Sequence, residues 1–373
     1  MNAQPLVDFA PAARLALLAL VIALLPLSWV WLRSRGADTR ARLAALTALT
    51  LFLTFDLVVF GAFTRLTDSG LGCPDWPGCY GEASPLGAHA DIHAAQTAAP
   101  GGPVSFSKAW IEMIHRYLAM TVGVLILVMA AVSWKERRRL PFSPLWPSIT
   151  LVWVVVQGLF GKYTVTLKLY PLVVTAHLVG GLVLLALLAY QHAAFVNRPL
   201  ALPGRLRALL LAAFAALSLQ VVLGGWVSTN YAVLACTGFP TCNGQWWPEM
   251  DVAHGFTLLR GLGEGGLTHA ALVAIHMAHR LVAVLAVVLL GWLALRLWRS
   301  GDAPLRRFGA VLAGLLLAQL ASGLSNVVLG WPLPAALAHS AGAAGLVLCL
   351  SLLLARSLSQ AAPRAAGHAV LAA

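Results

Sequence analysis

The chain has 373 residues, of which 60% are apolar and only 10% are charged, and its formal net charge is +12. Soluble domains carry about 25% charged residues, so this composition excludes an ordinary soluble protein and is typical of a membrane protein. A positive charge can indicate nucleic-acid binding, but here the basic residues lie in short segments between apolar runs. That distribution excludes a nucleic-acid partner. It indicates a membrane protein whose apolar runs lie in lipid and whose basic residues flank them.

Apolar runs long enough to cross a ~30 Å hydrocarbon layer as helices recur along the whole chain. They are continuous rather than alternating, which excludes a membrane β-barrel. In chain order they predict nine spans, at 13–32, 43–63, 108–133, 145–163, 170–194, 206–228, 268–296, 308–329 and 334–355. The predicted fold class is therefore an all-α membrane protein.

The first span, 13–32, has only Arg14 as an early positive charge, and no small-x-small cleavage site precedes the basic segment after it. A cleaved signal peptide usually has a positively charged start and a small-x-small cleavage site. We therefore expect an uncleaved helix, with a signal peptide as the alternative. This helix and its basic loop form a separate N-terminal unit, 1–42.

The basic residues predict the orientation of the spans. Most of them fall in alternate connections and in the C-terminal tail, and that side is cytoplasmic by the positive-inside rule. The N-terminus is then outside and the C-terminus, with a tail at 357–373, inside. The basic residues on this side are Arg33, Arg35, Arg40, Arg42, Lys135, Arg137, Arg138, Arg139, Arg198, Arg205, Arg207, Arg296, Arg299, Arg306, Arg307, Arg356 and Arg364.

Two long loops, 64–107 and 230–267, fall outside, and each carries one cysteine pair with a spacing of six. An oxidising compartment favours disulfides, so we predict a Cys73–Cys79 bridge and a Cys236–Cys242 bridge. A redox-active role is the alternative, and it requires a thiol of low pKa. Cys349 lies within the last span and is interpreted as a small packing residue.

The chain contains an internal duplication, which four successive landmarks reveal. GAFTRLTDSGLGCPDWPGC at 61–79 matches GGWVSTNYAVLACTGFPTC at 224–242, and IEMIHRYLA at 111–119 matches AIHMAHRLVA at 274–283. Gln157 and Gly161 match Gln319 and Gly323, and His177 matches His339, with offsets of 162–164 throughout. The sequence therefore predicts two tandem four-helix bundles, 43–195 and 206–356, as parallel repeats in an eight-helix core.

Four histidines occupy matching places inside the predicted spans: His115, His177, His279 and His339. Ionisable residues within a membrane are costly and usually functional, and facing histidines in a helix bundle are typical of haem or metal sites. Two histidines alone are too few for zinc, whereas haem needs only axial ligands. The alternative, a hydrogen-bonding packing role, explains a single histidine better than four at repeated positions.

Charged neighbours accompany these histidines. Arg116 and Arg280 each follow a histidine, turned off the ligand face, and we predict that they pair with haem propionates; lipid headgroups or a buried acid are the alternatives. Glu112 lies one turn before His115, where the second half has His276. A carboxylate beside a haem edge can act as an acid or base, so this asymmetry suggests a substrate in one half and a permanent cofactor in the other.

The remaining polar residues of the spans carry weaker signals. Asp56 receives no catalytic role, and His276 is an alternative to His279 as a ligand, although the repeated His-Arg pair favours His279. The other histidines are interpreted as solvated or local, and they are His89, His93, His192, His254, His269 and His368.

Several motifs along the chain resemble those of a known family. TRLTDSGLGCPDWPGC (64–79), EMIHR (112–116), QGLFGKYTV (157–165), the second His-Arg pair and AHSAGAAGL (338–346) together resemble the haem A synthase family of cytochrome oxidase assembly factors, over roughly 43–356. The resemblance implies an oxidoreductase that converts haem O to haem A by oxidising the methyl group at porphyrin position 8 to a formyl group in two hydroxylations. It also implies eight helices in two halves, in a bacterial cytoplasmic (inner) membrane.

The resemblance further implies particular roles for residues. A haem B cofactor would lie between His279 and His339, and the haem O substrate near His115 and His177, with Glu112 as the family's essential carboxylate handling protons. The loop cysteines correspond to those of members with paired cysteines. Expected partners are the haem O substrate, the haem O synthase and other assembly factors, and a homo-oligomer is allowed. The extra span 13–32 and His276 depart from the family pattern.

Two rival functions explain part of the pattern. A di-haem electron-transfer cytochrome b accounts for the four histidines but not for Glu112 replacing its repeat partner. A haem or ion transporter suits parallel repeats, but the predicted spans lack the mid-membrane interruptions that mark transporter sites. The haem content of the purified protein separates the first rival from the synthase, and vesicle assays test the second.

Overall fold

The computed structural model describes residues 10–140, 142–260 and 266–358. Over these residues the chain forms eleven α-helices and one short 3-10 helix. Nine of the described helices are long and apolar enough to cross a membrane. The predicted tail at 357–373 lies outside the described residues beyond Leu358, as do Arg364 and His368. The all-α membrane fold class is confirmed.

Each predicted span corresponds to one helix, and the ends differ from the prediction by at most five residues, mostly as extensions. The nine helices are α1 (Ala10–Arg33), α2 (Thr39–Leu66), α4 (Phe106–Lys135), α5 (Leu145–Thr166), α6 (Pro171–Val196), α7 (Gly204–Thr229), α9 (His269–Trp298), α10 (Ala303–Val328) and α11 (Leu333–Leu358). The extra residues include many Arg, Ser and Thr side chains, because a helix continues past the hydrocarbon layer wherever its backbone can be capped.

Side-chain caps fix where several of these helices begin. Ser105 accepts a hydrogen bond from the Lys108 amide at the start of α4, and Thr268 accepts one from Ala271 at the start of α9. The two caps stand 163 residues apart, so the duplication extends to the helix ends. Such caps satisfy amide groups that have no partner inside the helix, and each stabilises its helix by about 1 kcal/mol.

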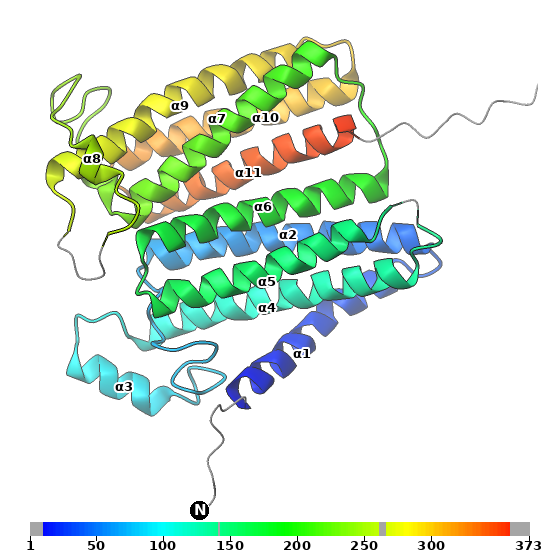
Figure 1. Cartoon of the computed structure of the whole chain (residues 1–373), viewed down its shortest axis with the longest axis horizontal. Coiled ribbons are helices and arrows are strands. Elements are labelled where there is room, and N and C mark those ends of the chain that lie inside the picture. Colours follow the sequence, from blue (N-terminus) through cyan, green and yellow to red (C-terminus); the bar gives the residue numbers. More distant parts are fainter. Residues whose placement is uncertain (1–9, 141, 261–265, 359–373) are drawn as a thin grey trace, which may run out of the picture.

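The eight long helices after α1 form two groups of four. In the first, α2 packs against α4 and α6, and α5 packs against the same two helices; α7, α9, α10 and α11 form the second group. The groups meet where α6 packs against α11, while α6 also contacts α7 and α11 contacts α2. Figure 1 shows α6 and α11 side by side along the middle of the molecule, with one group on either side. The helices that carry His177 and His339 are thus the two at the centre of the joint.

Helix α1 is outside this eight-helix core. It runs along the edge of the first group and packs against α4 and α2 (Figure 1). Its buried face carries Leu15, Ala19 and Ala23, whereas the opposite face is exposed. Near its start, the Arg14 guanidinium lies 3.6 Å from the Glu82 carboxylate of the first loop. In this structure α1 is a supporting helix that touches the first loop.

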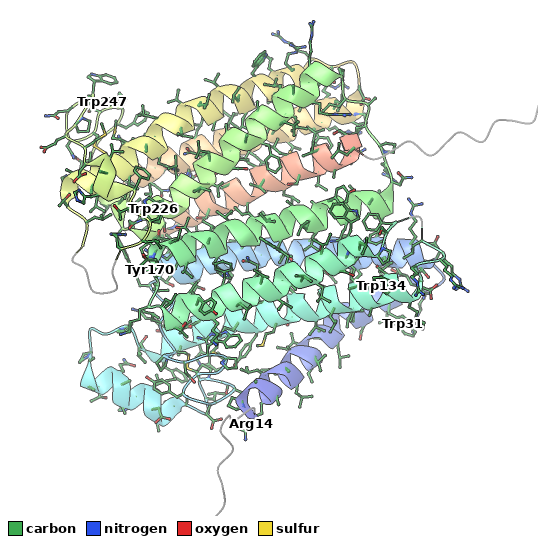
Figure 2. The ribbon with its side chains drawn as sticks, viewed as in Figure 1. Arg14, Trp31, Trp134, Tyr170, Trp226 and Trp247 are labelled. Carbon is green, nitrogen blue, oxygen red and sulfur yellow. A yellow bond between two sulfur atoms is a disulfide. The ribbon has the colours of Figure 1, made fainter. Side chains whose placement is uncertain are left out.

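Aromatic side chains gather at both ends of the spans. Tyr170 and Trp226 lie at the end that carries the long loops, and Trp31 and Trp134 lie at the other end (Figure 2). Tyr and Trp prefer the two membrane–water interfaces, so their placement fits helices that cross a bilayer from end to end. We call the end with the loops 67–105 and 230–268 the loop end.

The loops contain short elements that the hydrophobic pattern did not reveal. They are α3 (His89–Ala98), the 3-10 helix η1 (Ala232–Leu234) and α8 (Val252–Gly255). Helix α3 buries only Ile92. A helix with a single buried side chain has no apolar periodicity, so its presence was not predictable from the hydrophobic pattern.

Candidate functional site

Each long loop begins with a disulfide-closed hairpin. Cys73 is bonded to Cys79, and Cys236 is bonded to Cys242, so both predicted bridges are confirmed. After each bridge an isolated β-bridge follows, Cys79 with Glu82 and Cys242 with Gln245. The two hairpins therefore share one construction, as expected from the duplication, and we refer to them as the first and second hairpin.

Polar side chains inside each loop stabilise its turns. The Asp75 carboxylate accepts hydrogen bonds from the amides of Tyr80 at 2.6 Å and Gly81 at 2.8 Å. Burial, followed by the carboxylates of Asp75 and Asp91, raises the pKa of the Tyr80 phenol, so this group stays neutral near pH 7. In the second loop, hydrogen bonds from the His254 amide and ring to the carboxylate lower the pKa of Asp251.

An arginine from the following helix attaches each hairpin to the bundle. Arg116 of α4 donates to the carbonyl oxygens of Asp75, Pro77 and Gly78. Arg280 of α9 donates to the carbonyls of Gly238 and Thr241, both at 3.1 Å. Gly238 and Thr241 are the repeat partners of Asp75 and Gly78. The two arginines thus perform the same structural task in the two halves.

The residue one turn before each arginine also contacts the loop, but with different chemistry. Glu112 is buried, forms an ion pair with Arg116, and accepts a hydrogen bond from the Cys73 amide at 2.8 Å. His276 is buried too, and its Nδ1 lies 3.0 Å from the Ala232 carbonyl oxygen. Both side chains therefore hold a loop, and neither occupies a histidine-pair site. The His276 contact supports the choice of His279 as the second-half ligand candidate.

The two arginines differ in whether a carboxylate balances their charge. The charge of Arg116 is balanced by Glu112. In the structure the partner of Arg116 is therefore a buried acid, which was an alternative to the predicted propionate. Among the described residues, Arg280 has no carboxylate partner, and its Nε is buried without a hydrogen bond. Only Arg280 keeps an unused donor and an unbalanced charge for an added anionic group. Propionate pairing by either arginine stays a prediction.

The four span histidines lie in two pairs near the loop end. His115 is nine residues into α4, and His177 is six residues into α6. His279 and His339 are ten and six residues into α9 and α11. At 1.5 Å per residue these imidazoles start roughly 9–15 Å from their helix ends, at similar depths. In each half the two helices that carry the histidines pack against the same two neighbouring helices, so the structure places each predicted pair within one four-helix group.

A glycine from a neighbouring helix faces each of the four rings. A Cβ atom built on Gly61 would lie 3.0 Å from Nε2 of His115, and one on Gly224 would lie 3.1 Å from Cε1 of His279. A Cβ atom built on Gly161 would lie 3.7 Å from Cε1 of His177, and one built on Gly323 would lie 2.9 Å from Cε1 of His339. Any larger residue would crowd three of these rings, so glycine is needed where the backbone meets the imidazole.

Buried polar atoms without partners gather around the same rings. Within the described chain they include Nδ1 of His177, both amide atoms of Gln157, and Oε1 of Gln220 and of Gln319. Buried polar groups are normally satisfied, so a group of orphans at one place indicates a ligand. Two imidazoles per half, glycine-lined approaches and unused polar atoms fit a haem in each half. The described residues contain no group of three or more His, Cys, Asp or Glu side chains that could hold a metal ion.

The remaining candidates lie apart from these pairs. Asp56 is exposed on α2, with no polar partner in the described part of the chain. Cys349 is buried and free within α11, as predicted for a packing residue. The ring of His192 lies 3.3 Å from the Ala44 carbonyl, His254 pairs with Asp251, and His89 stacks near His93 in α3.

Sequence reasoning missed several residues that contact the histidines. The glycines at 61, 161, 224 and 323 had been noticed only as landmarks of the duplication, although their repetition one helix away from each histidine was a usable signal. Gln220 gave no signal, because it lacks a matching polar residue in the first half. Its contact with His279 depends on how α7 is rotated against α9, which periodicity alone does not fix.

The fold and the paired sites define a helical, multi-span membrane protein with two equivalent histidine-pair sites at one end. A family of cytochrome oxidase assembly proteins matches residues 44–351, and the chain belongs to this family. The chain is similar to the haem A synthase of Shewanella oneidensis, with 39% identity over 318 residues that cover 83% of this chain and 94% of the relative.

Two further relatives carry the same name. The haem A synthase of Methylobacterium sp. (strain 4-46) is 32% identical over 343 residues, covering 85% of this chain and 92% of the relative. That of Shouchella clausii is 28% identical over 305 residues, covering 77% and 86%. The family match at 44–351 extends across both histidine pairs. With nine apolar helices and these bacterial relatives, the chain is an integral inner-membrane protein.

Proposed function

We propose that this protein is a haem A synthase, an enzyme of haem A biosynthesis that oxidises the position-8 methyl group of haem O to a formyl group. The main support is the pair of repeat-related imidazole sites, each approached by two glycines. The chain that carries them is 39% identical to a haem A synthase over most of its length. A di-haem electron carrier would use the two halves alike. Here their surroundings differ, as Glu112 and His276 illustrate.

The first half, 43–195, is the proposed substrate site. His115 and His177 would orient the haem O ring, and His115 is flanked by Phe60, whose ring is stacked at 6.5 Å between centroids. Neither imidazole has a hydrogen-bond partner among the described residues, and Nδ1 of His177 is buried without one. Both rings are therefore available to a porphyrin that must also leave. Membrane-spanning apolar surface on the same helices suits the isoprenoid chain of the substrate.

The second half, 206–356, is the proposed cofactor site. His279 and His339 would hold a haem B, which supplies one-electron transfer when bound. Arg280 would pair with a propionate, because its Nε–H is unused and no acid balances its charge. The protein contributes orientation and electrostatics in both halves.

Glu112 has a structural contribution that the sequence did not predict. One oxygen pairs with Arg116, and the other accepts from the Cys73 amide, so the carboxylate holds the first hairpin beside the outer end of the substrate site. Proton handling by Glu112 stays a prediction. It requires the carboxylate to release at least one of these contacts when substrate is bound.

The proposed topology follows the basic residues, with the N-terminus and loop end outside and the C-terminus in the cytoplasm. This places both disulfides on the oxidising side. The haem O synthase and other assembly factors are the proposed partners in the membrane, since the substrate is apolar and must arrive from another membrane enzyme.

Haem analysis of cells that express this chain together with a haem O source tests the function. We expect haem A to accumulate with the wild type and to be lost in His115→Ala and His177→Ala. A protein that is purified with two tightly held haem B groups and forms no haem A would be the electron carrier instead. A colourless protein would refute both assignments.

A further inference from the structure

The two halves differ in the hydrogen-bonding side chains around their imidazoles. In the second half, the Gln220 amide nitrogen lies 3.1 Å from Nδ1 and 3.2 Å from Nε2 of His279. Nδ1 of His339 lies 3.2 Å from both the Ser322 hydroxyl and the Gln319 carbonyl oxygen. In the first half, the repeat positions of Gln220 and Ser322 hold Leu57 and Phe160. Hydrogen-bonding side chains in one half are thus replaced by apolar ones in the other.

The distinction matters for an imidazole that binds a metal. When one ring nitrogen ligates, the other carries a proton and needs an acceptor, which fixes the tautomer and the ring orientation and makes the ligand more basic. For His339, the Gln319 carbonyl can only accept, so Nδ1 is the protonated nitrogen. Nε2 is then the acceptor, and it lies 3.3 Å from the side-chain amide nitrogen of Gln319, a contact that a metal ligated by Nε2 would replace. Ser322 provides a second hydrogen-bonding oxygen at the same nitrogen.

Gln220 can provide the same support to His279. Its amide oxygen is buried and has no partner among the described residues. The oxygen and nitrogen of an amide exchange places by a simple flip, so Gln220 can accept from the ring N–H once the other ring nitrogen ligates. A buried amide oxygen without a partner is costly, and such a contact would satisfy it.

Resting on the function proposed above, we infer that Gln220 and Ser322 are positioning residues that make His279 and His339 permanent haem ligands, whereas Leu57 and Phe160 keep His115 and His177 exchangeable. The duplicated unit therefore acquired a cofactor site and a substrate site by different hydrogen bonding to the two imidazoles of each half. Specific supports of this kind typically change metal affinity by 10–100-fold.

The test uses the full-length protein in a His115→Ala/His177→Ala background, so that only the second-half haem is observed. Gln220→Leu installs the residue of the first half, Ser322→Ala removes one hydroxyl, and Ser322→Thr retains it. Ser218→Leu on α7 and Ser325→Ala on α10 are matched controls, because both hydroxyls bond to their own helix. Haem loss to an excess of apomyoglobin and the midpoint potential of the bound haem are measured.

We expect Gln220→Leu and Ser322→Ala each to accelerate haem loss by about 10-fold or more, within the range for such supports. Both should also raise the midpoint potential, because a less basic ligand stabilises ferric iron less well. Ser322→Thr and the two controls should behave like the parent. Unchanged haem loss and potential in Gln220→Leu and Ser322→Ala, with haem still dependent on His279, would overturn this inference and leave the proposed function standing.

A reciprocal variant keeps the test decisive if Gln220→Leu fails to fold. Leu57→Gln, in a His279→Ala/His339→Ala background, places an amide beside His115. We expect it to slow the release of haem from the first half, and release at the parent rate would contradict the inference. A parent protein that binds haem in neither half would instead refute the proposed function.

Discussion

Arg65 and Ser228 occupy the same position in the two repeats, and they contact each other. The Arg65 guanidinium donates to the Ser228 carbonyl oxygen at 2.6 Å, and it also lies 4.3 Å from the ring centroid of Tyr231. Asp68 and Tyr231 are repeat partners as well, and the tyrosine hydroxyl donates to the carboxylate at 3.1 Å. Equivalent residues meet in this way only near an axis that relates two parallel repeats, so this cluster marks the joint between the halves at the loop end.

Replacing Arg65 by alanine should weaken this joint. The side chain is only 15% exposed, and its loss removes a hydrogen bond from a charged donor together with a cation–π contact. Such contacts contribute about 1–3 kcal/mol, so the thermal midpoint of the purified protein should fall by several degrees. Arg139→Ala at the opposite end is the control, since that side chain is 82% exposed. Equal midpoints for the two variants would count against the joint.

Gly323→Ala should displace His339 and deplete the second-half haem. The added methyl group would lie 2.9 Å from the ring, too close for the imidazole to keep its place. The Soret absorbance per protein should fall by half or more if the second half loses its haem. Gly314→Ala on the same helix is the matched control, because nothing lies within 4 Å of its added atom. Full haem content in Gly323→Ala would show that the ring does not depend on this glycine.

Glu112 and Arg116 should show strong coupling in a double-mutant cycle. Removing one partner leaves a buried charge unpaired, which typically costs about 3–5 kcal/mol, whereas removing both avoids that penalty. We therefore expect Glu112→Ala and Arg116→Met each to destabilise the protein more than the double variant does. Thermal denaturation measures the stabilities, and proteolysis of the first hairpin reports its detachment. Additive effects would argue against the buried pair.

The activity of these variants addresses the second role of Glu112. Glu112→Gln keeps an oxygen for the Cys73 amide but loses the negative charge. If this variant folds normally and haem A production is lost, the carboxylate does more than hold the hairpin. Unchanged haem A production in Glu112→Ala would remove Glu112 from the chemistry altogether.

Arg280→Gln should lower haem retention in the second half more than Arg116→Gln does in the first. Arg280 has no acidic partner in the described chain, whereas the guanidinium of Arg116 is already engaged by Glu112. Loss of a charged hydrogen bond to a propionate corresponds to about 1.5–3 kcal/mol, or roughly 10–100-fold in haem affinity. Competition with apomyoglobin measures this difference, and equal retention in the two variants would contradict the unequal roles.

Much of the fold was predictable from the sequence. The spans follow from the hydrocarbon thickness, because any segment that lies in lipid must be apolar over about 20 residues and satisfy its own backbone. The histidine positions followed from the duplication, since they recur at offsets of 162–164, and both disulfides followed from the spacing of six between cysteines in loops on the oxidising side. These properties are local, or repeat locally, and so remain visible in one dimension.

The tertiary structure alone decided which polar groups meet. Glu112 was expected beside a haem edge, but its oxygens contact Arg116 and the first hairpin, and Gln220 reaches His279 from a different helix. Helix α3 gave no pattern because it buries one side chain. Such contacts depend on the rotation and spacing of packed helices, which change by an ångström or a few degrees without altering any hydrophobic period. The sequence therefore determined the spans and their duplication, and packing determined the partners.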